Sequence, residues 1–133
     1  LTGRAASERA VKSLADPPDV LHFATHAFFL GNECVEGRPA YSPLLLTGLA
    51  LAGANDLGEL DGIGQDDGVL TGVEIASLDL SQTRLVVLSA CDTGGGTVQD
   101  GEGVLGLRRA FHAAGAKTLV MSLWLVGDNA TSQ

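Results

Sequence analysis

Three segments rich in apolar residues stand out along the chain, and each is short enough to form a single buried strand. They are residues 19–27 with the sequence DVLHFATHA, residues 84–90 with RLVVLSA, and residues 117–125 with KTLVMSLWL. Such runs are typical of parallel strands covered on both faces. We therefore expect three core strands, of which the first ends near His26 and the second ends at Cys91.

Two other segments carry apolar residues at helical spacing. Residues 4–15 predict a helix that ends before the two prolines at positions 17 and 18. Residues 103–116 predict a longer helix, with Gly115 as its C-cap. The apolar stripe of that longer helix is expected to consist of Val104, Leu107, Ala110, Phe111 and Ala114.

A third helix is predicted from its start signal. Thr71 and Glu74 stand three residues apart and fit a capping box, which favours a short helix through Leu78. Helices and strands then alternate along the chain, and this alternation indicates an α/β fold with a parallel sheet. We find no internal repeat and no sign of a second domain, so residues 1–133 are expected to form one domain.

The remaining segments are predicted to be mostly irregular. Residues 27–42 are interpreted as a loop, and residues 42–53 as one bent strand or two short strands around Gly48. Residues 53–68 are rich in glycine and aspartate and predict a long exposed loop. Residues 126–133 resemble the start of another helix.

Composition narrows the classes of function. The 133 residues include 16 acidic and 8 basic ones, a net charge of −8, which argues against binding a nucleic-acid backbone. The longest apolar runs, of about ten residues, are too short to span a bilayer, and no signal peptide is recognisable. Two cysteines make no disulfide framework, so we expect reduced thiols and a cytoplasmic location. The chain begins without methionine and stops just after a strand-like run, which suggests part of a longer protein.

The predicted fold points to one edge of the sheet as the place for chemistry. Ligands of open α/β sheets bind outside the carboxyl ends of the strands. His26 and Cys91 each stand at the carboxyl end of a predicted strand. If those two strands are neighbours, the imidazole and the thiol share one crevice.

The stretch LVVLSACDTGGG, residues 85–96, offers competing interpretations. Asp92, Thr93 and Gly94 match the short motif of an aspartic protease, but that mechanism needs two such carboxylates, and a predicted helix follows the motif. We therefore take this match to be fortuitous.

A glycine motif nearby resembles a dinucleotide-binding fingerprint. Residues 101–106, GEGVLG, match the spacing G-x-G-x-x-G. The motif should follow a strand directly, however, and the preceding residues are TVQD. Glu102 also puts a negative charge where a phosphate would bind. Glycines that shape the loop are the simpler interpretation, and no nucleotide cofactor is expected.

A zinc site is a further alternative. His22, His26, Cys34 and Cys91 are ligand types, but the two histidines lie in a strand-like segment, and no close cysteine pair exists. We therefore expect no metal. His22 is interpreted as a sheet or core histidine with a satisfied hydrogen bond, and His112 as a partly exposed helix residue.

The remaining pair is Cys91 with His26. A thiol becomes a strong nucleophile beside a base, and the free N–H groups of a glycine-rich loop can hold an oxyanion. A buried structural cysteine explains the same residue equally well. Residue types and positions alone leave both interpretations open.

Several motifs together resemble a known family. VLHFATHAFF, SPLLLTGLALAG, DGVLTGVEIASLDL, LVVLSACDTGGG and DGEGVLGLRRAFHAAGAKTLVMSLW follow one another as they do in the CHAT domain, a caspase-like peptidase domain often attached to tetratricopeptide repeats, mostly in bacteria. The resemblance covers nearly the whole chain. It implies an α/β caspase-like three-layer sandwich with a mostly parallel sheet, here without its C-terminal elements.

The resemblance also implies a site. Mapped by motif, the dyad histidine is His26 and the dyad cysteine is Cys91, 65 residues later (91 − 26 = 65), near the roughly 50 of caspases. The implied activity is that of a cysteine endopeptidase without cofactors, in which the backbone N–H groups of Ala27 and Cys91 form the oxyanion hole. The implied partners are a protein or peptide substrate and tetratricopeptide or other sensor modules in the parent chain, with neither nucleic acid nor membrane.

Two features depart from the family pattern. Ala27 replaces the usual glycine after the histidine and could not adopt a left-handed backbone as glycine does. The family also continues beyond the SLW motif. These departures motivate the alternative of a catalytically inactive regulatory or protein-interaction domain. Three acidic residues after Cys91 could select a basic substrate side chain: Asp92, Asp100 and Glu102. The simpler interpretation is that the two aspartates are solvated loop carboxylates and that Glu102 favours the start of the helix.

Overall fold

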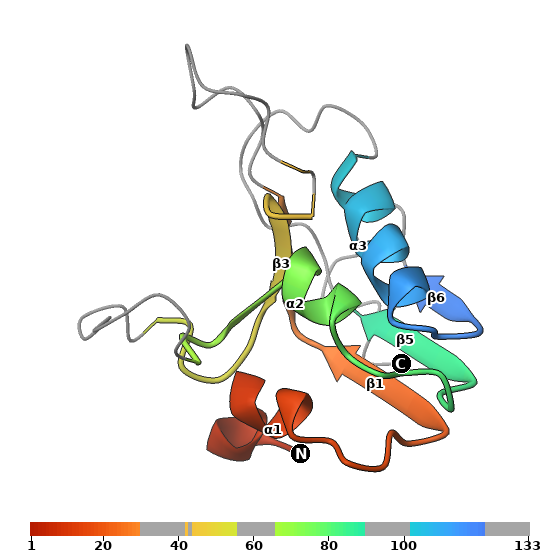
Figure 1. The fold of residues 1–133 in the computed structure, drawn as a ribbon. Coiled ribbons are helices and arrows are strands. Elements are labelled where there is room, and N and C mark those ends of the chain that lie inside the picture. Colours follow the sequence, from red (N-terminus) through yellow and green to blue (C-terminus); the bar gives the residue numbers. More distant parts are fainter. Residues whose placement is uncertain (30–41, 43, 56–65, 90–101, 122–133) are drawn as a thin grey trace.

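A parallel sheet of three strands forms one side of the described part of the chain (Figure 1). The computed structural model describes residues 1–29, 42, 44–55, 66–89 and 102–121, the last range with side chains only from residue 105 onward. The strands are β1 (Val20–Ala24), β5 (Leu85–Ser89) and β6 (Leu119–Met121), in the order β1-β5-β6. All three strands predicted from apolar runs are therefore confirmed. The first ends two residues earlier than expected, at Ala24.

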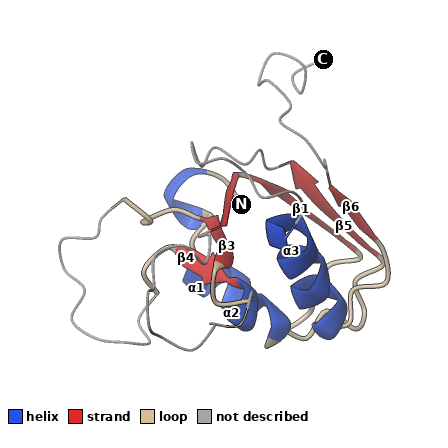
Figure 2. Cartoon of the chain, turned by 90° about the horizontal axis from the view of Figure 1, so that it is seen from above, coloured by secondary structure: helices blue, strands red, loops and turns tan. Residues whose placement is uncertain are grey.

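Helix α3 (Glu102–Ala113) lies along this sheet, as Figure 2 shows from above. Phe111 is fully buried, and its ring lies 5.8 Å from that of Phe23 on β1. The described part of the expected apolar stripe is confirmed: Leu107, Ala110, Phe111 and Ala114 are all buried. The helix ends at Ala113, and Gly115 follows it as the predicted capping glycine, with a φ of +95° that suits a residue without Cβ.

The other face of the parallel sheet is open among the described residues. Val20 on β1 and Val120 on β6 are 51% and 53% exposed. The pairing His22–Val87–Val120 places a row of side chains across this face. The described residues thus supply a sheet and a helical layer on one face, a mixed α/β architecture that is compatible with a caspase-like fold. The third layer of the expected sandwich has no counterpart in this part of the chain.

The sequence predicted only part of a second, antiparallel sheet. It consists of β2 (His26–Phe29), β3 (Thr47–Ala50) and β4 (Val69–Thr71), in the order β2-β3-β4. The loop predicted for residues 27–42 was wrong for residues 27–29, which pair with β3. The segment around Gly48 forms one short strand. A Cβ at position 48 would lie 2.8 Å from the Phe28 ring and 2.9 Å from the Leu70 carbonyl oxygen, so the space admits only glycine. Close backbone approach, rather than a break, explains this glycine.

The N-terminal helix is shorter than predicted. In place of one helix over residues 4–15, the chain forms a 3₁₀ turn, η1 (Gly3–Ala5), and helix α1 (Glu8–Lys12). Between them the Ala6 carbonyl accepts a hydrogen bond from the Ala52 N–H, a tertiary bond that replaces a helical one. Ser7 then caps α1 by accepting a hydrogen bond from the Ala10 N–H.

Helix α2 (Gly72–Ala76) begins with the capping box that the sequence predicts. The Thr71 hydroxyl accepts a hydrogen bond from the Glu74 N–H, and the Glu74 carboxylate accepts one from the Thr71 N–H. The helix ends at Ala76, two residues before the predicted end at Leu78. It packs against α3, and the buried Ile75 joins the core.

A group of charged side chains fastens α1 to the start of α2. Lys12 forms ion pairs with Glu8, with Glu74 at 2.7 Å and with Asp66 at 3.8 Å. Glu8 is only 1% exposed and accepts a hydrogen bond from the Gly68 N–H. Burial raises the pKa of Glu8. Burial also acts to raise the pKa of Glu74, but hydrogen bonds from Lys12 and Thr71 outweigh it, so the pKa of Glu74 is lowered.

Candidate active site

The strands that lead to the two proposed dyad residues are neighbours in the parallel sheet. β1 and β5 pair in register from Val20–Leu85 to Ala24–Ser89. In sequence, His26 follows Ala24 by two residues (26 − 24 = 2), and Cys91 follows Ser89 by two (91 − 89 = 2). The condition that the strands lie side by side is therefore met, while Cys91 itself and Cys34 lie outside the described residues.

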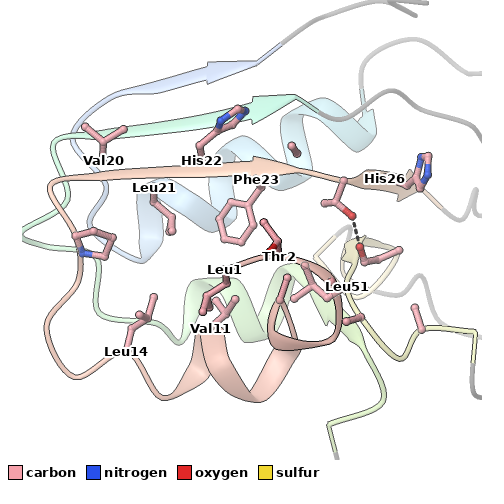
Figure 3. A pocket seen from close by; sticks show the side chains of 18 of the residues that line it. Leu1, Thr2, Val11, Leu14, Val20, Leu21, His22, Phe23, His26 and Leu51 are labelled. Carbon is pink, nitrogen blue, oxygen red and sulfur yellow. Dashed lines mark hydrogen bonds between the residues drawn. The ribbon is translucent and has the colours of Figure 1, made fainter. Parts of the chain in front are cut away.

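His26 is the first residue of β2 rather than the last residue of β1. The chain bends at Thr25, whose hydroxyl donates to the Ala50 carbonyl, and His26 then pairs with Ala50 on β3. Figure 3 shows the imidazole beyond the end of β1. It is exposed and forms no hydrogen bond with any residue in the described part of the chain. The side chain is thus free to contact a group that approaches this edge of the sheet.

Ala27 occupies a conformation that alanine adopts readily. It lies within β2, pairs with Leu49 and is half-buried. Among the described residues no non-glycine residue has a positive φ. The backbone at Ala27 therefore does not require glycine, and the strain anticipated from the sequence does not arise there.

The other two histidines match their expected structural roles. His22 lies on β1, and its Nε2 forms a hydrogen bond of 2.8 Å with the Ser89 Oγ of β5. His112 is exposed on α3. Ser89 is the polar partner that the sequence analysis did not identify, because pairing across strands depends on their register. Among the described residues no group of three or more potential ligands could hold a metal ion.

A cavity of about 850 Å³ lies along β1, on the side of the N-terminal segment (Figure 3). Apolar side chains dominate its lining, including Val11, Leu14 and Leu21. His26 stands at one end of β1 in the same view. No local sequence pattern predicts this cavity, because its walls come from three segments that only the fold brings together: residues 1–18, 20–26 and 50–55.

The acidic residues considered for substrate selection cannot be placed. Asp92 and Asp100 lie outside the described residues, and Glu102 is described only as the first backbone position of α3. A preference for basic substrate side chains therefore stays a prediction. No helix in the described ranges has the length and apolar character needed to cross a membrane.

Comparison with known proteins gives a family match over the full chain. The CHAT domain family matches residues 1–133. Tetratricopeptide repeat protein 28 of Mus musculus is 31% identical over an alignment of 141 residues, and the alignment covers 95% of this chain. The chain spans only 6% of the length of that relative. No solved structure matches the chain.

Proposed function

This chain belongs to the CHAT domain family, and on that premise we propose that it is the core of a cysteine endopeptidase with His26 and Cys91 as its dyad. The observation that carries the proposal is the parallel, in-register pairing of β1 with β5. Because the two residues follow paired strand ends by equal numbers of positions, both are expected at the same edge of the sheet.

The proposed reaction proceeds through an acyl-enzyme. The Cys91 thiol loses its proton to His26 and attacks the peptide carbonyl carbon, which forms the new S–C bond. As the C–N bond breaks, the imidazolium returns the proton to the leaving amine. A water molecule then hydrolyses the thioester, restores the thiol and releases the carboxylic acid.

Backbone N–H groups stabilise the charge that develops on the carbonyl oxygen. We assign this role to the N–H groups of Ala27 and Cys91, which would face the oxyanion. The extended backbone at Ala27 supports the assignment, because this residue reaches its conformation without strain. Neither the attack nor the hydrolysis requires a metal or a nucleotide.

The reactivity of the two thiols tests the dyad directly. In the complete parent protein, Cys91 is expected to be alkylated faster than Cys34 near neutral pH, because a nearby imidazole favours the thiolate. His26→Ala should abolish this advantage, while His112→Ala, which removes an exposed histidine of α3, should leave it intact. Equal labelling of both cysteines, unaffected by His26→Ala, would contradict the proposal.

Peptide cleavage supplies the second test. Cys91→Ala should abolish cleavage by the complete parent protein, since it removes the nucleophile. Cleavage that persists unchanged in Cys91→Ala would rule out this chain as the peptidase. The peptide substrate, the cytoplasmic location and the tetratricopeptide or other sensor modules of the parent chain belong to the same proposal, and the repeat protein from mouse supports the last of these.

One observation favours a second candidate, a caspase-like domain that binds partners without cutting. His26 is exposed and has no orienting hydrogen bond in the described part of the chain, whereas a catalytic imidazole is usually held by a third group. In that case Cys91 would label no faster than Cys34, and the chain would bind its partner equally well with Cys91→Ala.

A further inference from the structure

A side-chain hydrogen bond crosses between the two strands that lead to the proposed dyad. The His22 Nε2 and the Ser89 Oγ lie 2.8 Å apart. In the register, His22 pairs with Val87 and Ala24 pairs with Ser89, so the bond runs diagonally from β1 toward the carboxyl end of β5. It reaches the last residue of that strand.

This bond lies on the open face of the parallel sheet. In Figure 3, His22 projects to the side of β1 opposite Leu21 and Phe23, which face the core. Its described neighbours on this face are mainly apolar, with Val87 directly opposite and Val120 beyond it. His22 is exposed and Ser89 half-buried. A partly solvated hydrogen bond contributes little to the stability of the folded state, so the core does not depend on it.

The place of the bond is more informative than its strength. Ser89 is followed two positions later by Cys91, and His22 is followed four positions later by His26 (91 − 89 = 2; 26 − 22 = 4). Between β1 and β5, no other side-chain hydrogen bond is present among the residues within these two strands. The bond therefore connects the carboxyl ends of the two strands that precede the residues of the proposed dyad.

We propose that His22 and Ser89 are positioning residues for the proposed peptidase: their hydrogen bond holds the carboxyl end of β5 against β1, and so sets the separation of the segments that carry Cys91 and His26. This inference rests on the proposed function. Displacement of a reacting group by about 1 Å can lower a rate by about a hundredfold, so a small loosening of this strand end has a measurable effect.

The test compares variants of the complete parent protein. Ser89→Ala removes the hydroxyl, whereas Ser89→Thr keeps it. Val87→Ala is the matched control, because it shortens a side chain on the same face of the same strand but removes neither partner of the hydrogen bond. Each variant is measured for the alkylation rate of Cys91 relative to Cys34, for kcat and KM of peptide cleavage, and for its melting temperature.

The expected pattern separates positioning from stability. Ser89→Ala lowers the Cys91 alkylation rate and kcat by roughly tenfold to a hundredfold while KM stays close to its original value. Ser89→Thr restores both, and Val87→Ala lowers neither, even where it lowers the melting temperature. If Ser89→Ala fails to fold, His22→Ala, which changes an exposed side chain, makes the same comparison, with His22→Gln as the variant that keeps a hydrogen-bonding group.

Three outcomes overturn the inference, and they differ from one another. If His26→Ala slows alkylation of Cys91 but Ser89→Ala and His22→Ala do not, the dyad stands and the positioning role is wrong. If His26→Ala has no effect on Cys91, the proposed function fails and the positioning role fails with it. A loss of kcat in Val87→Ala equal to that in Ser89→Ala would mean that the open face supports the site only through packing.

Discussion

The two sheets of this chain share one hydrophobic core but differ in what their packing requires of single residues. The parallel sheet is packed through side-chain volume, as in the contact between Phe23 and Phe111. The antiparallel sheet also buries a large side chain, Leu70, in the same core, but in addition it needs the absence of a side chain at Gly48, whose backbone the Phe28 ring and the Leu70 carbonyl approach closely. The first kind of packing leaves a strong pattern in the sequence, and the second leaves a single glycine.

The largest effect is expected on the parallel side. Phe111→Ala should destabilise the chain by about 3–5 kcal/mol, because the side chain is fully buried and its removal leaves a cavity against β1. Urea denaturation provides the measurement. Arg108→Ala, at an exposed position of α3, is the control and should change stability little. Equal effects of the two substitutions would contradict the packing described for α3.

The next effect tests the antiparallel side. Gly48→Ala should cost about 1–3 kcal/mol, because the new Cβ would overlap the Phe28 ring and the Leu70 carbonyl. Adding Phe28→Leu should recover part of the loss, since a smaller side chain relieves one of the two overlaps. If Gly48→Ala left the stability unchanged, the close approach of neighbouring groups to Gly48 would not contribute to the stability of this sheet.

A smaller effect is expected where the antiparallel sheet leads into helix α2. Thr71→Ala should cost about 1 kcal/mol, because it removes the hydroxyl of the capping box. Thr71→Ser keeps the hydroxyl and should retain most of the stability, as thermal unfolding would report. If the two variants lose the same amount of stability, the loss comes from the Thr71 methyl group and not from the hydroxyl of the capping box.

The smallest effect is a difference in pH dependence between two carboxylates that share Lys12. The pKa of Glu74 is lowered from its ordinary value of 4.5, so its contribution to stability is present above that pH and is lost as the pH falls through the lowered pKa. Glu74→Gln should therefore weaken the loss of stability in acid.

Glu8 should behave in the opposite sense. Burial raises its pKa above 4.5, so its contribution is present below that pH and is lost as the pH rises through the raised pKa. Glu8→Gln should remove that decline. Melting temperatures between about pH 3 and pH 7 measure both variants, and slopes that change in the same direction would refute the assignment.

The candidate site was predictable to different degrees. The motif around His26 marked this histidine from sequence alone, and the apolar runs predicted that a strand precedes each residue of the proposed dyad. The sequence did not show that His26 begins a new strand, because its partner on β3, Ala50, lies 24 positions away (50 − 26 = 24). Ser89 was overlooked for a similar reason, since its partner His22 is 67 positions away.

By itself, the sequence determined the local features of this protein. Continuous apolar runs specify the three parallel strands, helical spacing specifies α3, and the capping box at Thr71 specifies the start of α2, because each depends on residues close together in the chain. Only the tertiary structure decided the antiparallel sheet, the role of Gly48, the cavity beside β1 and the bond between His22 and Ser89. Each of these arises where distant segments meet, and no local pattern encodes which segments will be neighbours.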